Sequence, residues 1–140
     1  MNRVTGIVCT LLAALAVAVA AQAPKRISDE AYTEAMKEIG PLSQEFRKNL
    51  EGGAAAAAAG DAARLEALFA DVLAYWEARE VDDAVAGSRI AFTAAASASK
   101  AIAANDMRAA ANAQKTLQGT CRDCHRVYRE RLPDGTYRFK

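Results

Sequence analysis

Apolar residues recur at spacings of three and four along most of the chain, the pattern of helices with one buried face. No stretch alternates with a period of two, and alanine, the strongest helix former, is abundant. We therefore expect four helices, over about residues 28–50, from Asp61 through Trp76, over about 82–104 and over about 106–131. The apolar face of the first helix is predicted to contain Tyr32, Ala35, Met36, Ile39, Leu42, Phe46 and Leu50.

Short connections separate the later helices, which forces neighbouring helices to run antiparallel. Gly52-Gly53, six alanines and Gly60 are interpreted as a loose first connection, because so short an alanine run is not a stable helix alone. Pro133-Asp134-Gly135 predicts a turn that ends the fourth helix and leaves a short tail. The expected fold class is all-α, an antiparallel four-helix bundle. The other predicted core residues are Leu65, Leu68, Phe69, Val72 and Trp76 in the second helix, Val85, Ile90, Phe92 and Ile102 in the third, and Met107, Ala110, Leu117, Cys121, Cys124 and Tyr128 in the fourth.

The first 20 residues have the layout of a secretory signal peptide. Arg3 gives a basic start, and an almost purely apolar run from Val8 to Ala21 ends in small residues. The alternative is an uncleaved membrane anchor, but about 14 apolar residues fall short of the roughly 20 that a spanning helix needs. We expect residues 1–20 to be removed, residues 24–140 to form one domain in the periplasm, and the mature chain to have no membrane contact.

The charge of the chain is nearly balanced, with 18 basic and 17 acidic residues. Loss of residues 1–20 would remove Arg3 and no acidic residue, so the mature chain would be close to neutral. This balance gives no indication of nucleic acid as a partner. Cys9 would leave with the leader, so only Cys121 and Cys124 would remain.

The string Cys121-Arg122-Asp123-Cys124-His125 carries the clearest chemical signal. Cys-x-x-Cys-His is the attachment signature of c-type haem. Two thiols at this spacing add to the two vinyl groups of haem, and the next residue presents an imidazole to the iron. We therefore expect one covalent haem c per chain, held by Cys121 and Cys124 near the end of the fourth helix, with His125 as the proximal iron ligand.

Three other readings of the cysteine pair remain open. A thioredoxin-like redox pair normally lies at the start of a helix after a strand, and no strand is predicted here. A structural disulfide is compatible with an oxidising compartment but does not need the adjacent histidine. A zinc site needs further ligands, and the mature chain has no other cysteine or histidine.

The single histidine also limits the sixth coordination position of the iron to methionine, a small exogenous ligand or nothing. Met107 precedes His125 by 18 residues on the same predicted helix, about 27 Å along it. Met36 lies on a different helix and can face the motif from across the bundle. It is the candidate distal ligand, and the alternative is that it only fills space in the core.

These residues resemble the cytochrome c′ / cytochrome c-556 family. The run from Gly119 to Arg129 is similar to that family's C-terminal motif, and residues 35–40 are similar to its first helix, where Met36 occupies the distal position. The resemblance implies a four-helix bundle that often forms homodimers. In the c-556 members a methionine at this position ligates the iron, whereas in the c′ members the iron is five-coordinate and binds NO or CO.

The chain departs from the family pattern at Tyr32, where an arginine is common, and in its tail from Leu132 to Lys140. Arg129 is similar to a family residue near the proximal histidine; it is a candidate haem-pocket residue or a solvated surface residue. Tyr128 packs either on the haem or in the bundle, and Trp76 is expected in the core rather than in an electron path.

The expected function is electron transfer with redox partner proteins of the periplasm, because ligation by His125 and Met36 allows a change of oxidation state with little rearrangement. The alternative is a c′-like protein that binds NO or CO. No acid–base pair or substrate pocket is apparent in the sequence, so we do not expect an enzyme.

Overall fold

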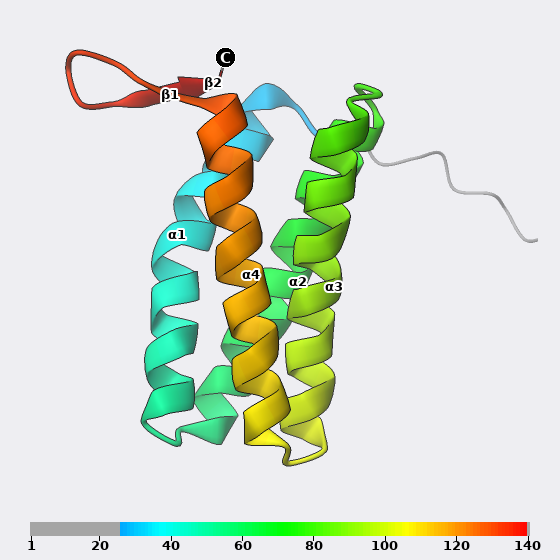
Figure 1. The fold of residues 1–140 in the computed structure, drawn as a ribbon, viewed down its shortest axis with the longest axis vertical. Helices are drawn as coiled ribbons and strands as arrows, with labels where there is room; N and C mark the ends of the chain where they lie inside the picture. The colour runs from blue at the N-terminus through cyan, green and yellow to red at the C-terminus, as the bar shows by residue number, and fades with distance from the viewer. Residues whose placement is uncertain (1–25, 140) are drawn as a thin grey trace, which may run out of the picture.

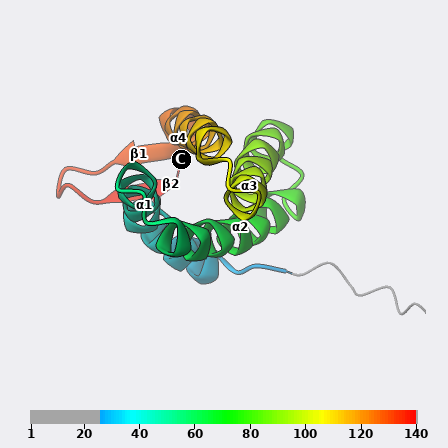
Figure 2. The ribbon, with the colours of Figure 1, turned by 90° about the horizontal axis from the view of Figure 1, so that it is seen from below.

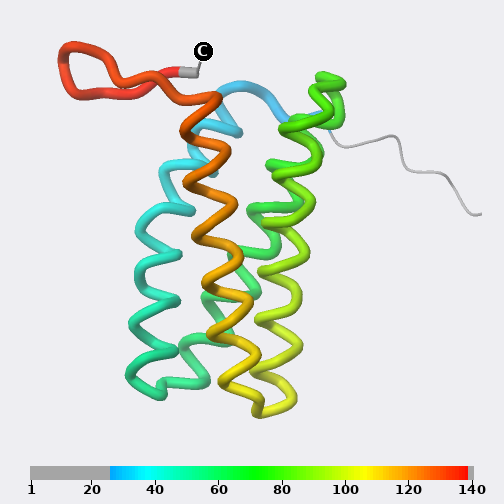
Figure 3. Tube along the Cα trace, in the orientation of Figure 1, coloured from blue at the N-terminus to red at the C-terminus, as the bar shows by residue number. Residues whose placement is uncertain are grey.

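The structure is a computed structural model that describes residues 26–139, so the predicted leader lies outside the described residues. The described chain forms four long helices that run alternately up and down, followed by a small hairpin (Figures 1 and 3). The predicted all-α antiparallel four-helix bundle is confirmed. The elements are α1 (Asp29–Glu51), α2 (Ala55–Glu77), α3 (Asp82–Ala103), α4 (Met107–Tyr128), β1 (Arg129–Arg131) and β2 (Tyr137–Phe139).

Local sequence explains where two of the helices begin. The hydroxyl of Ser28 accepts a hydrogen bond from the Ala31 N–H at 3.2 Å and so caps α1, as the sequence predicts. The carboxylate of Asp106 accepts a bond from the Ala109 N–H at 2.9 Å and caps α4 in the same way. These side chains satisfy backbone donors that have no partner within the helix.

The prediction of a loose alanine-rich connection is wrong. α2 begins at Ala55 and continues through the alanines and Gly60, and only residues 52–54 separate it from α1. Gly53 supplies the turn with a φ of 70°, a conformation that favours glycine. Ala58 and Ala62 are fully buried, so packing against the rest of the bundle stabilises a segment too short to be helical alone.

The end of the fourth helix is also different from the prediction. α4 ends at Tyr128, and β1 pairs antiparallel with β2, with Arg129 opposite Phe139 and Arg131 opposite Tyr137. The predicted turn around Asp134 is present, but it joins two strands rather than ending a helix. Its tight geometry is supported by a hydrogen bond from the Thr136 N–H to the Asp134 carboxylate at 2.9 Å.

The core follows the predicted faces of α1, α2 and α4, whereas α3 differs. All five predicted core residues of α2 are buried, and in α1 Phe46 is fully enclosed. Ile90 was predicted to be in the core but is 52% exposed. The buried face of α3 is made instead mostly of small residues: Ala84, Ser88, Ala91, Ala94, Ala95, Ala98 and Ile102.

Viewed along the bundle, the four helices follow one another in chain order around a ring (Figure 2). α1 packs much less closely against α4 than against α2, so the bundle is least closed between its first and last helices. Within residues 26–139 no helix is long and apolar enough to cross a membrane.

Candidate functional site

A cavity of about 440 Å³ opens between α1 and α4. Phe69 and Val72 of α2 and Gly87, Ser88 and Ala91 of α3 form its inner walls. The site residues predicted from the sequence meet here, with one exception described below. The lining from α1 and α4 comprises Met36, Lys37, Ile39, Gly40, Ser43, Gln44, Gln114, Leu117, Gln118, Thr120, Cys121, Cys124 and His125, together with Arg129 of β1.

The face of α4 brings the motif residues together. Cys121, Cys124 and His125 are spaced by three and four residues, so they share one side of the helix. Both cysteines are free thiols and are partly buried at the cavity wall. The motif therefore presents two thiols and an imidazole to one enclosed space.

Burial determines the protonation of these three groups. It raises the pKa of the Cys121 thiol to about 11, and neighbouring Cys124 adds to the rise. Burial, followed by the charge of Asp83, raises the pKa of Cys124. Burial, followed by the charge of Arg129, lowers the pKa of His125. At neutral pH the site therefore holds protonated thiols and a neutral imidazole, which has a lone pair available for a metal.

Met36 faces this group from α1. It lies 15 residues before the end of α1, and Cys121 lies 14 residues after the start of α4, so the two are level in the antiparallel bundle. Met107 is the first residue of α4, at the opposite end of the bundle from His125, and it does not line the cavity. The structure thus distinguishes the two methionines as the sequence predicts.

Arg129 lies beside the histidine, in a setting that the sequence analysis missed. Its guanidinium is 3.4 Å from the His125 Nδ1 atom. The same guanidinium lies over the ring of Tyr137, 3.4 Å from its centroid. The hairpin therefore holds Arg129 next to the imidazole. The only sequence signal for this hairpin was the Pro133-Asp134-Gly135 turn followed by an aromatic residue.

Tyr128 is the predicted pocket residue that the structure does not bring to the cavity. Its hydroxyl donates a hydrogen bond to the Asp83 carboxylate of α3. Its ring lies 5.1 Å from that of Trp76, which is buried in a cluster with Tyr32 and Tyr75. Tyr128 consequently packs in the bundle, and Trp76 is a core residue.

Two polar residues of the cavity were also missed by sequence reasoning. Ser43 Oγ and Gln114 Nε2 are buried and have no hydrogen-bond partner among the described residues. Both residues line the cavity. Their spacing offered a weak signal, because Ser43 follows Met36 by seven residues and Gln114 precedes Cys121 by seven, which places each on the same helix face as a predicted site residue.

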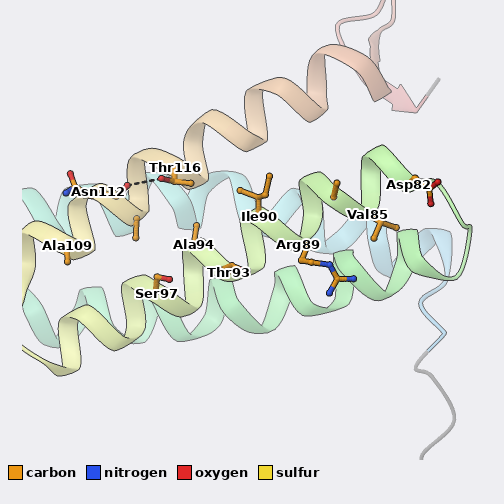
Figure 4. A pocket seen from close by; sticks show the side chains of 12 residues that line it. Asp82, Val85, Arg89, Ile90, Thr93, Ala94, Ser97, Ala109, Asn112 and Thr116 are labelled. Carbon is orange, nitrogen blue, oxygen red and sulfur yellow. Dashed lines mark hydrogen bonds between the residues drawn. The ribbon is translucent and has the colours of Figure 1, made fainter.

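A larger and shallower groove, of about 860 Å³, runs between α3 and α4 (Figure 4). Its lining is mainly small and apolar, with Ile90 prominent and with Asp82 and Arg89 as its charged residues. Thr116 on its wall donates to the Asn112 carbonyl oxygen at 3.2 Å, an ordinary bond within a helix. The groove contains no cysteine, histidine or methionine and is not the candidate site.

Comparison of the chain with protein-family models, with curated proteins and with solved structures found no match in any of the three. Among residues 26–139, no three histidine, cysteine or acidic side chains gather as a protein-only metal site would require. The zinc reading of the cysteine pair therefore gains no further ligand from the described residues.

Proposed function

We propose that this chain is a c-type cytochrome that transfers electrons, with haem held covalently by Cys121 and Cys124. The observation that carries the proposal is the meeting of Cys121, Cys124 and His125 with Met36 in one cavity between α1 and α4. The similarity of the motif to the cytochrome c′ / c-556 family supports the same assignment.

The residues of the cavity fit such a group. Phe69, Val72 and Leu117 provide apolar walls against which a flat macrocycle can pack. A Cβ atom placed on Gly40 or Gly87, which also line the cavity, would meet nothing within 4 Å. The buried polar atoms of Ser43 and Gln114 have no partner within the described chain, and an occupant with acceptor groups would supply one.

Each residue has a defined role in this proposal. The Cys121 and Cys124 thiols would hold the haem through thioether bonds, each S–H adding across one of its two vinyl groups, and the neutral imidazole of His125 would bind the iron. Met36 would offer a thioether sulfur from α1 as a second iron ligand, and methionine ligation raises a reduction potential. When bound, the haem supplies one-electron redox chemistry. The leader-like residues 1–20 support export to the periplasm and redox partners there.

Expression together with a c-type haem maturation system tests the proposal. We expect haem to stay with the wild-type chain in denaturant. We expect no haem to stay with the double variant Cys121→Ala/Cys124→Ala. Loss of all haem from the denatured wild type would refute covalent attachment.

The distal ligand is tested separately by Met36→Ala, with Met107→Ala as a matched control. We expect low-spin iron in the wild type and in Met107→Ala, and high-spin iron in Met36→Ala, by optical spectroscopy. Identical low-spin spectra in all three proteins would show that Met36 does not ligate the iron.

A c′-like protein that binds NO or CO is the second candidate. It is favoured by the position of Met36, which packs against the hydrophobic core as a space-filling residue would. A high-spin wild-type spectrum that changes on addition of CO would select this function, whereas a low-spin spectrum unaffected by CO would select electron transfer.

A further inference from the structure

Positive and negative charges are segregated along this chain, although its total charge is nearly balanced. Residues 26–106 include 8 basic and 14 acidic residues, whereas residues 107–138 include 7 basic and 3 acidic residues. From Met107 to Arg122 the fourth helix contains no acidic residue. The part of the molecule made by α4 and the hairpin is therefore positive, whereas the rest is negative, and such a division bears on association with partners.

The exposed face of α4 carries positive side chains beside the candidate site. Gln118 lines the cavity between α1 and α4. Arg122 and Arg126 follow it in steps of four residues, so the three side chains form one column on the helix. Both arginines are exposed, and each directly follows a motif residue in the sequence. The positive column therefore starts at the rim of the cavity proposed for the haem.

The hairpin extends this positive surface beyond the end of α4 (Figure 1). Arg129 and Arg131 are two residues apart on β1, so their side chains lie on the same face of the hairpin. Tyr137 pairs with Arg131 across the strands, and its ring stacks on the Arg129 guanidinium. Tyr137 is 51% exposed. The hairpin thus presents an exposed aromatic ring flanked by two arginines.

Arginine supplies every positive charge of this region. Between Lys115 and Lys140 the chain has five arginines and no lysine. The planar guanidinium can bind a carboxylate through two parallel hydrogen bonds, and arginine and tyrosine are enriched where proteins meet. Arg122 and Arg131 form no ion pair with another described residue. The ion pairs that do form here are exposed and therefore weak: Arg126 with Asp123 at 3.9 Å and Arg138 with Glu130 at 2.9 Å.

We propose that this region is the docking surface for an acidic redox partner protein. The inference rests on the function proposed above. Electron transfer becomes rapidly slower with distance, so a partner must dock close to the opening of the cavity, where these arginines lie. Carboxylates on the partner pair with the arginines, and Tyr137 supplies apolar contact. The basic docking surface comprises Arg122, Arg126, Arg129, Arg131, Tyr137 and Arg138.

Acidic side chains at the same end of the bundle favour a partner with a limited contact area. Asp29 and Glu30 begin α1, and Asp82 and Asp83 begin α3, at the end of the bundle where α4 finishes. A flat anionic membrane laid across this end would meet these acidic residues as well as the arginines. A protein can contact the arginines alone, and the neighbouring negative charges then help to orient it.

The salt dependence of electron exchange tests the surface in the haem-loaded protein. In the test reaction the reduced protein gives one electron to hexacyanoferrate(III), a trianion, which becomes hexacyanoferrate(II). The nearly neutral total charge of the mature chain predicts almost no effect of salt on this rate. A positive surface at the place of exchange predicts a rate that falls as the ionic strength rises. A rate that stays constant or rises with salt would overturn the proposal.

Arg122→Glu and Arg108→Glu form a matched pair for this reaction. Both arginines are exposed on the same face of α4, but they are 14 residues apart, about 21 Å along the helix. At an ionic strength of about 0.1 M we expect Arg122→Glu to slow the oxidation about fivefold. Arg108→Glu should have little effect, because salt screens a charge at that distance. Equal effects of the two variants would show that total charge, rather than a local surface, governs the rate.

A reagent of opposite charge separates docking from a change in reduction potential. With tris(phenanthroline)cobalt(III), a trication that accepts one electron, Arg122→Glu should make the oxidation faster, because the variant no longer repels the reagent. A shifted reduction potential would change the rates with both reagents in the same direction. That result would overturn the docking role of Arg122.

Poly-L-glutamate locates the surface and identifies the class of partner. Added to the reduced, haem-loaded protein, it should shift amide NMR signals mainly within residues 122–138, and Arg122→Glu should weaken this binding. Shifts spread over all four helices would overturn the proposal. Binding to vesicles of anionic phospholipid that Arg122→Glu abolishes would assign the surface to a membrane instead.

Failure of the docking surface is distinguishable from failure of the proposed function. If the wild type carries covalent haem but its oxidation by hexacyanoferrate(III) is no slower at high salt, the docking surface alone is overturned. If the wild type carries no covalent haem, the proposed function fails and the inference fails with it.

Discussion

Gly87 and Gly60 offer a matched test of where the haem resides. Each is the sixth residue of its helix, Gly87 in α3 and Gly60 in α2. A Cβ atom at either position would meet nothing within 4 Å, so neither substitution requires the backbone to shift. Only Gly87 lines the cavity between α1 and α4, and Gly60 is exposed. Leucine at the two positions therefore differs mainly in whether it enters the cavity.

The expected stability gain can be worked from helix propensity and burial. Replacing a helical glycine with leucine gains about 0.8 kcal/mol of propensity, and both variants share this term. At Gly87 the new side chain also leaves water for an apolar-lined cavity, which adds about 1 kcal/mol for a partly buried leucine. In the haem-free chain we expect the free energy of unfolding to rise by about 2 kcal/mol for Gly87→Leu and by about 1 kcal/mol for Gly60→Leu.

Haem loading of Gly87→Leu should fall, in contrast to the rise in the stability of the haem-free chain. Gly87→Leu fills space that the macrocycle needs, so the fraction of chains with covalent haem should fall well below that of the wild type, while Gly60→Leu should load normally. Urea unfolding of the haem-free chains and mass spectrometry of the co-expressed proteins measure the two quantities. Equal haem loading of Gly87→Leu and Gly60→Leu would refute the placement of the haem in this cavity.

Three further predictions concern the core, the hairpin and a polar pair. Phe46→Ala should lower the free energy of unfolding by about 3–5 kcal/mol in urea titrations, since Phe46 is fully buried, and a loss below about 1 kcal/mol would contradict its place in the core. Tyr137→Ala should increase the mobility of the Arg129 guanidinium in ¹⁵N relaxation measurements, because a cation–π contact of about 0.5–1 kcal/mol is lost. Tyr137→Phe keeps the aromatic ring and should leave the mobility of Arg129 unchanged. Equal mobility of Arg129 in the two variants would show that the ring does not hold the guanidinium in place. The Tyr128 hydroxyl lowers the pKa of Asp83, so this pair stabilises the fold above the ordinary pKa of the carboxyl group, and the contribution disappears as the pH falls through the lowered value. The bond to Asp83 likewise raises the pKa of Tyr128 to about 12, so the contribution is fully present below pH 10 and is lost as the pH rises through 12. Tyr128→Phe should therefore be less stable than the wild type at pH 7, and the difference in the free energy of unfolding should shrink as the pH falls below the ordinary pKa of the carboxyl group. A difference that stays constant across the acid range would assign the effect to packing.

The helical periodicity was sufficient to predict the number of helices, their order and most of their buried faces. The periodicity gave wrong predictions where contacts with other helices determine whether a segment is helical or which of its faces is buried. The alanines after Gly53 have high helix propensity but too few residues to be helical alone, and the burial of Ala58 and Ala62 makes them part of α2. Ile90 is exposed for a related reason, because the small residues of α3 determine which of its faces approaches the neighbouring helices.

The candidate site shows the same division between local and tertiary information. Cys121, Cys124 and His125 are close in sequence, so their chemistry and common helix face follow from the sequence by itself. Three other features join residues that are far apart in the chain or lie in the hairpin. Met36 of α1 lies at the same height in the bundle as Cys121 of α4, the buried polar atoms of Ser43 and Gln114 line one cavity, and the ring of Tyr137 stacks on the Arg129 guanidinium. Only the tertiary structure decides these contacts, because they depend on how the antiparallel helices are set against one another and on where α4 ends.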